Sequence, residues 1–166
     1  MASETTVAGA LARDLAAYGA RRCFALLGTA NFKISHALAE AGVEIISARH
    51  EGNAASMADA YAKATQDLTL VSVHSGPGLT NALTGIAEAA KSRTPLLVLA
   101  GDVPAGAVKN NFHFDQAAMA RSVGAVAERI HAPGTAREDT LRAVTRDFRV
   151  TLNTVWTRSR SRMLFT

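Results

Sequence analysis

The chain has 166 residues, of which 48% are hydrophobic and 19% are charged. That length suits about one domain with a sizeable hydrophobic core, and the composition excludes an intrinsically disordered chain. The net charge of +4 is concentrated near the end, where Arg158, Arg160 and Arg162 lie in a stretch without acidic residues. The rest of the chain is nearly neutral, so we expect no basic face that would bind nucleic acid.

The cysteine content and the apolar runs bear on the cellular compartment. Cys23 is the one cysteine, which excludes an internal disulfide and a cysteine-rich metal site. Residues 1–6 lack the basic region and apolar run of a signal peptide. No apolar stretch approaches the roughly 20 residues that cross a bilayer. We therefore expect a cytoplasmic protein that does not insert into a membrane.

Short apolar runs alternate with helical patterns along most of the chain. The helical patterns cover residues 6–18, 34–41, 53–62, 79–90, 116–122 and 135–152, and the apolar runs cover residues 22–27, 43–47, 68–73, 95–100 and 126–130. Apolar strands that alternate with helices are typical of a parallel sheet covered on both faces. The sequence predicts an α/β fold with a doubly wound, mostly parallel sheet flanked by helices.

The last residues differ from the rest. The segment from Thr151 onward alternates arginine and serine and ends on Met163, Leu164 and Phe165, without a strand or helix pattern that suits a core. We therefore expect one domain over residues 1–152 and an aberrant or disordered basic tail over residues 153–166. Deleting such a tail should leave the stability of the domain unchanged.

Ligands of open α/β sheets bind beyond the carboxyl ends of the strands. Four segments of this chain fall there, namely residues 28–31, 49–51, 75–81 and 101–102. Taken singly, these features have structural explanations. Glu51 at a helix start interacts favourably with the helix dipole, and isolated histidines such as His50, His74 and His113 are typical of packed or capping positions. No pair of histidines has a metal-ligand spacing.

The turn Ser75-Gly-Pro-Gly78 follows a predicted strand and precedes a helix, as the first part of a dinucleotide-binding fingerprint does. However, Asn81 stands where the third glycine would be, and Pro77 removes an amide that a pyrophosphate would use. A dinucleotide-binding oxidoreductase is therefore a disfavoured alternative.

Three longer motifs occur together, and the set is far more specific than any one of them. They are Arg49-His-Glu-Gly-Asn-Ala-Ala-Ser-Met-Ala-Asp-Ala-Tyr-Ala62, Ser75-Gly-Pro-Gly-Leu-Thr-Asn81 and Pro95-Leu-Leu-Val-Leu-Ala-Gly-Asp102. In this order and spacing they resemble the N-terminal, pyrimidine-binding domain of thiamine-diphosphate enzymes of the acetolactate synthase and pyruvate oxidase type. The resemblance spans about residues 7–150. It implies the fold of that domain and a part in the decarboxylation or ligation of 2-keto acids.

The resemblance also implies roles for individual residues. Glu51 would be the catalytic residue, because the equivalent carboxyl group hydrogen-bonds N1′ of the cofactor's aminopyrimidine and starts a proton relay to C2 of the thiazolium. The cofactor supplies the electron sink and the protein places the proton. Ser75, Pro77 and Asn81 would line the pyrimidine, and Gln116 would approach the reacting centre.

Two positions depart from the family's pattern. Ala30, which would also contact the cofactor, and Asn31 stand where the family usually has a Pro-Gly pair. Many acetolactate synthases have Phe-Gln before the short helix, whereas this chain has Phe114-Asp-Gln116.

The family also has a middle domain and a C-terminal domain whose Gly-Asp-Gly…Asn motif holds Mg²⁺ and the diphosphate, and neither follows here. We therefore expect a truncated chain that is inactive alone, with Mg²⁺ bound only through the missing domain or a partner chain. The expected partners are a small 2-keto acid in the complete enzyme and either a second copy of this chain or a chain with the diphosphate domain. A non-catalytic dimerisation fragment and one chain of a split thiamine enzyme remain alternatives.

Overall fold

The computed structural model describes residues 6–103 and 109–145, and the backbone of residues 151–155. Six strands form one sheet in the order β2-β1-β3-β4-β6-β5, and every neighbouring pair is parallel. The strands are β1 (Arg22–Ala25), β2 (Glu44–Ser47), β3 (Thr69–Val73), β4 (Leu96–Gly101), β5 (Val126–Ile130) and β6 (Thr151–Val155).

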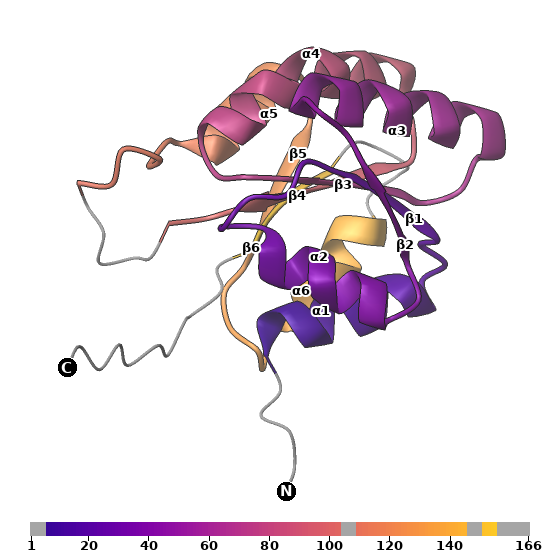
Figure 1. Ribbon diagram of the computed structural model, residues 1–166, viewed down its shortest axis with the longest axis vertical. Coiled ribbons are helices and arrows are strands. Elements are labelled where there is room, and N and C mark those ends of the chain that lie inside the picture. Colours follow the sequence, from indigo (N-terminus) through magenta and orange to yellow (C-terminus); the bar gives the residue numbers. More distant parts are fainter. Residues whose placement is uncertain (1–5, 104–108, 146–150, 156–166) are drawn as a thin grey trace, which may run out of the picture.

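Helices cover both faces of the sheet (Figure 1). They are α1 (Val7–Ala17), α2 (Phe32–Glu40), α3 (Glu51–Thr65), α4 (Pro77–Ser92), α5 (Gln116–Ser122) and α6 (Ala136–Thr145). Helices α1, α2 and α6 contribute to the hydrophobic cluster on one face, and α3, α4 and α5 contribute to the cluster on the other. The doubly wound, parallel α/β fold expected from the sequence is confirmed.

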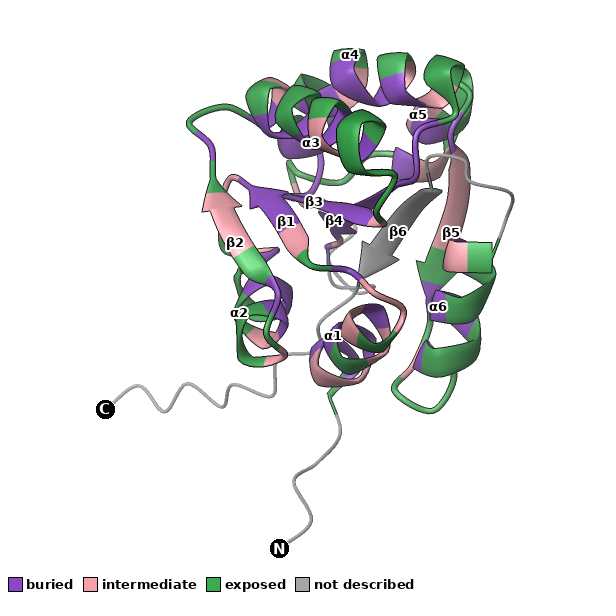
Figure 2. Cartoon of the chain, turned by 90° about the vertical axis from the view of Figure 1, so that its right-hand side faces the viewer, coloured by how far each residue is buried: buried purple, intermediate pink, exposed green. Residues whose placement is uncertain are grey.

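The two central strands explain why the apolar runs are continuous. Every residue of β3 and β4 is buried, as Figure 2 shows in purple. Leu70 belongs to the cluster under α1 and α2, whereas Val71 belongs to the cluster under α3 and α4. Because successive side chains of a strand point to opposite faces, a strand covered on both sides is mostly apolar, and β3 adds only the small hydroxyl side chains of Thr69 and Ser72.

Small residues let α3 and α4 approach each other closely. A Cβ atom at Gly85 of α4 would lie 2.6 Å from the Cβ of Ala55 on α3. The alanines on the buried side of α3 leave similar room for α4. This contact fixes the start of α3 relative to the start of α4, which becomes important for the site below.

The end of the chain differs from the sequence-based expectation. The helix expected over residues 135–152 ends at Thr145, and residues Thr151–Val155 form β6, which lies between β4 and β5. The interpretation that the segment from Thr151 lacks strand character is wrong, because its threonines and valine are β-branched and suit a pleated strand. The expected boundary at residue 152 falls inside β6. Residues 156–166 of the expected tail lie outside the described residues.

This strand makes a sharper truncation experiment possible. A chain that ends at Leu152 loses three residues of β6 that pair with both β4 and β5. We expect a loss of several kcal/mol in the free energy of unfolding, at about 1 kcal/mol for each lost backbone hydrogen bond, because the backbone groups of these residues bond on both sides. A chain that ends at Val155 should match the full chain. Thermal denaturation of the three proteins tests this, and equal melting temperatures for the two truncated chains would contradict the account.

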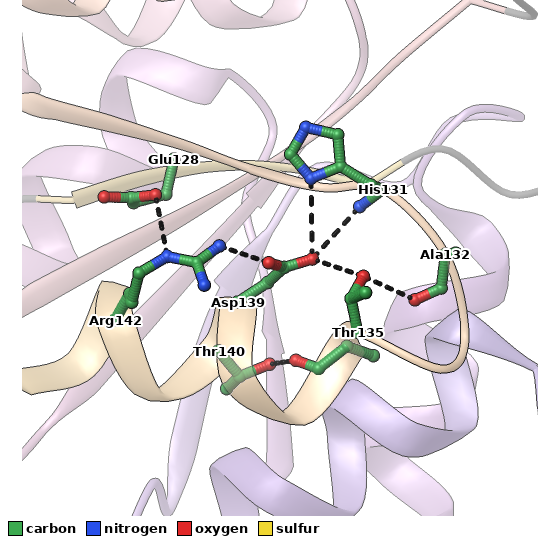
Figure 3. Close-up of polar contacts among 8 residues, drawn as sticks. Glu128, His131, Ala132, Thr135, Asp139, Thr140 and Arg142 are labelled. Atoms are coloured by element: carbon green, nitrogen blue, oxygen red, sulfur yellow. Dashed lines mark hydrogen bonds and ion pairs between the residues drawn. The ribbon is translucent and has the colours of Figure 1, made fainter.

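A buried acid joins α6 to the end of β5 (Figure 3). Asp139 is only 3% exposed, and it accepts hydrogen bonds from the backbone N–H of His131 at 3.2 Å and from the Thr135 hydroxyl at 2.8 Å. Arg142, one turn along α6, pairs with its other carboxylate oxygen. Burial alone would raise the pKa of Asp139, but these three donors outweigh it and hold the pKa below its usual value.

The lowered pKa of Asp139 predicts a dependence of stability on pH. Because the folded state binds the proton less tightly than the unfolded state, the stabilisation is complete above the unfolded pKa of about 4 and is lost as the pH falls through the lowered value. We expect Asp139→Asn to cost about 2 kcal/mol at neutral pH. Its urea denaturation curves should also change less than those of the wild type below about pH 4. Parallel pH profiles for the two proteins would contradict this assignment.

Candidate functional site

Three close contacts bring the segments that follow β1, β2 and β3 together with the end of β4 at the carboxyl edge of the sheet. A Cβ at Gly28 would lie 2.7 Å from the ring of His74, and a Cβ at Gly101 would lie 2.6 Å from the Cβ of Ala30. A Cβ at Gly78 would lie 3.3 Å from Oε1 of Glu51. Glycine at these positions therefore allows the loops to meet.

Glu51 is the first residue of α3, shortly beyond the end of β2. His50 caps this helix, since its Nδ1 accepts a hydrogen bond from the backbone N–H of Gly52 at 3.1 Å, which confirms the capping role expected for an isolated histidine. The helix start turns the Glu51 side chain into the edge, where the residue is only 8% exposed. Its Oε2 accepts a hydrogen bond from Nδ2 of Asn81 at 3.0 Å.

The other carboxylate oxygen of Glu51 is available for a ligand. Within residues 6–103 and 109–145 no group donates a hydrogen bond to Oε1, which lies beside the backbone of Gly78. A nearly buried carboxyl oxygen normally has a hydrogen-bond partner. The pair of Glu51 and Asn81 thus presents one oriented oxygen, next to a residue without a side chain, to whatever binds at this edge.

The turn between β3 and α4 has an uncommon backbone. Gly76 caps α4 with a φ of 60° and a ψ of −106°, and Pro77 opens the helix. Ser75 is buried, with its hydroxyl 3.2 Å from Nδ1 of His74, whereas Pro77 is exposed. Pro77 has no backbone N–H, so it suits the first helical position and stiffens the turn.

Gln116 bridges two strand ends with its side-chain amide. Its Oε1 accepts from the backbone N–H of Gly76 at 3.1 Å, and its Nε2 donates to the carbonyl of Gly101 at 2.9 Å. Asp115, the residue before it, caps α5 by accepting from the N–H of Ala118. The proposed approach of Gln116 to a reacting centre remains a prediction.

Asn31 anchors the loop after β1, a role that the sequence motifs do not indicate. Its side chain accepts from the N–H of Gly28 at 2.8 Å and donates to the carbonyl of Leu26 and to the hydroxyl of Ser72. Ser72 in turn lies 2.9 Å from the hydroxyl of Ser35. The available signal was an asparagine at a helix start, where this residue type is common. The network holds the neighbouring Ala30 against Gly101.

The predicted site residues therefore form one chain of contacts. Asn81 contacts Glu51, Ser75 and Pro77 flank Gly76, Gln116 links Gly76 to Gly101, and Gly101 packs against Ala30. The described part of the chain contains no cluster of three histidine, cysteine or acidic side chains able to hold a metal. Burial raises the pKa of Cys23 to about 12, so this thiol stays protonated and unreactive.

Comparison with known proteins decides the family. A family model described as the N-terminal TPP-binding domain of thiamine pyrophosphate enzymes matches residues 5–120. The chain belongs to this family. The matched segment contains β1 to β4, the Glu51 and Asn81 pair and the start of α5, so it holds every predicted site residue.

Several curated relatives are similar to part of this chain. The chain is 38% identical over 104 residues to an acetolactate synthase large subunit of Mycobacterium tuberculosis and 44% identical over 92 residues to the isozyme 3 large subunit of Escherichia coli. It is 33% identical over 94 residues to a sulfoacetaldehyde acetyltransferase of Roseovarius nubinhibens. These matches cover 55–62% of this chain but only 16–19% of each relative. The chain thus corresponds to a fragment of such proteins.

The residues at the edge fit the aminopyrimidine half of thiamine diphosphate. A pyrimidine ring nitrogen needs a group that can share a proton with it, and the Oε1 of Glu51 is such a group. The missing side chain at Gly78 leaves the approach to that oxygen open. The family membership and the chemistry of the residues at this edge therefore agree with each other.

Proposed function

We propose that this chain forms the aminopyrimidine-binding half of a thiamine-diphosphate active site, with Glu51 as the partner of N1′. One observation carries the proposal, namely that the carboxyl group of Glu51 is nearly buried and held by Asn81 while its Oε1 has no donor in the described part of the chain. Keeping such a group inside a protein costs free energy unless a partner arrives.

Each residue would contribute a separate function. Asn81 orients the carboxyl group, because its bond to Oε2 leaves Oε1 facing the ligand. Glu51 holds and releases a proton at N1′, which an amide in its place could not do. Ser75, Pro77 and Ala30 bound the space for the ring. The bound cofactor would supply the electron sink for decarboxylating and joining carbonyl compounds.

The remaining parts of the active site belong to another domain or chain. We propose that Mg²⁺ and the diphosphate bind there and that the substrate of the complete enzyme is a small 2-keto acid. The chain covers only 16–19% of the length of these relatives. A cytoplasmic location and pairing with a second copy of this chain complete the proposal. No helix in the described residues is long and apolar enough to span a membrane.

Titration of the isotopically labelled chain with thiamine tests the proposal without a partner. Thiamine carries the aminopyrimidine but no diphosphate, so it probes this half of the site alone. We expect weak, saturable changes in the NMR amide signals of Glu51, Gly78 and Asn81, while signals on the opposite edge of the sheet stay constant. Changes confined to residues away from the carboxyl edge would contradict the proposed site.

A further inference from the structure

Both the oxygen and the nitrogen of the Gln116 side-chain amide form hydrogen bonds. It is only 4% exposed, its oxygen accepts from the N–H of Gly76 at 3.1 Å, and its nitrogen donates to the carbonyl of Gly101 at 2.9 Å. Both partners are backbone groups at strand ends, one after β3 and one at the end of β4. A buried amide with both ends in use fixes the relative position of those two groups.

Gly76 lies between the end of β3 and α4 and is in close contact with the segment before α5. Its φ of 60° and ψ of −106° lie in a region that glycine adopts readily but that residues with a side chain rarely occupy, and it caps α4 without a side-chain hydrogen bond. The segment before α5 packs directly on it, since a Cβ at Gly76 would lie 2.7 Å from the carbonyl oxygen of Phe112 and from the ring of Phe114. Residues 112–116 therefore pack against the turn, and the side chain of Gln116 accepts a hydrogen bond from the N–H of Gly76.

We propose that Gln116 is a positioning residue that keeps the Ser75–Gly78 turn in its ligand-binding shape. The inference rests on the proposed function, because the turn matters only if an aminopyrimidine binds beside it. The turn sets the start of α4, and the first turns of α4 carry Asn81 to the carboxyl group of Glu51. A shift of the turn would therefore change the orientation of Glu51 through the hydrogen bond between Asn81 and Glu51.

The amide group itself is what this position requires. One side of it must accept from an N–H and the other must donate to a carbonyl, and glutamine does both. Gln116→Glu keeps the acceptor for Gly76 but replaces the donor for Gly101 by an oxygen that repels its carbonyl. Gln116→Met keeps the length of the side chain and removes both hydrogen bonds. The pair of variants separates the hold on Gly76 from the general packing of α5.

Native-state amide exchange of Gly76, measured by NMR on the whole chain, tests the proposal. We expect Gln116→Met to accelerate this exchange on the order of tenfold, because the N–H loses its partner. Gln116→Glu should restore part of the protection, because Gly76 keeps its acceptor. Met119→Ala, a partly buried change on the same helix, serves as the matched control and should leave Gly76 protected. Unchanged exchange in Gln116→Met would overturn the proposal.

Thiamine titration of the same proteins tests the positioning role. We expect weaker binding in Gln116→Met, partial recovery in Gln116→Glu and no loss in Met119→Ala. Equal losses of thiamine affinity in Gln116→Met and Met119→Ala would show that Gln116 contributes only packing and would overturn the inference. If the unmodified chain binds no thiamine, the proposed function fails, whereas the exchange of Gly76 still reports whether Gln116 holds the turn. Should Gln116→Met not fold, slow exchange of the Gln116 side-chain amide in the unmodified chain supports the contact, and fast exchange overturns it.

Discussion

Replacing Gly76 by alanine is expected to destabilise the domain by about 2–4 kcal/mol, because two separate costs add at this position. The first is the backbone conformation, since a φ of 60° with a ψ of −106° is strained for any residue with a side chain. The second is space, since the new Cβ would lie 2.7 Å from the carbonyl oxygen of Phe112 and from Cδ2 of Phe114. The segment before α5 would have to move away. Urea denaturation of the purified chain measures the loss.

Gly19→Ala supplies the control, because it separates the two costs. Gly19 has a φ of 93°, but a Cβ added to it would have nothing within 4 Å. We expect this variant to lose only about 1 kcal/mol, from the backbone conformation alone. The Gly76 variant should also weaken thiamine binding, while the Gly19 variant should not. Equal losses of stability in the two proteins would show that residues 112–114 do not pack closely against the turn.

Replacing Glu51 by glutamine is expected to abolish proton exchange at C2 of thiamine diphosphate once a complementary diphosphate-binding domain or chain is supplied. Glutamine can keep the hydrogen bond from Asn81, because its own Oε1 accepts as the carboxylate does. It can also still contact N1′, but it cannot move a proton along the relay. We expect a decrease on the order of a hundredfold or more in the exchange rate, as is typical when a general acid or base is lost.

Stability provides a second readout for the same variant. If Glu51 only supports the start of α3, its neutralisation should cost roughly 0.3–1 kcal/mol. If the carboxyl group is kept for function, the free energy of unfolding should be unchanged or higher. Asp59→Asn is the matched control, since Asp59 is a buried acid on the same helix, bonded to Thr94 and Lys63. Asp59→Asn should lose stability and keep the proton exchange at C2. Lost exchange in Asp59→Asn together with normal exchange in Glu51→Gln would contradict the catalytic role of Glu51.

Much of the fold could be predicted from the sequence because burial on both faces leaves a clear pattern. β4 is apolar throughout, β3 has only two small polar residues, Thr69 and Ser72, and glycine or capping residues bound the helices around them. The same logic placed Glu51 at a helix start after β2, where the structure has it. The missed strand, β6, mixes polar and apolar residues, Thr151-Leu-Asn-Thr-Val155, and so lacks the continuous apolar run of its neighbour β4.

The candidate site was predictable only as a set of residues, and its contacts were not. The order of the motifs placed Glu51, Ser75 and Asn81 at one edge, but no sequence pattern indicated that Asn81 would bond Glu51. The partners of Gln116 are two backbone groups from other strands, which leave no mark on the sequence. Asn31 was missed for the same reason, since its network depends on the folded positions of Leu26 and Ser72.

The most direct test of the central claim compares the binding of thiamine with that of an analogue in which N1′ of the pyrimidine is replaced by a C–H group. If Glu51 is the partner of N1′, the unmodified chain should bind the analogue on the order of tenfold more weakly, in line with one hydrogen bond to a charged group. Glu51→Ala should bind both compounds equally, because the discriminating oxygen is gone. Equal binding of the two compounds by the unmodified chain, or a preference that survives in Glu51→Ala, would contradict the account.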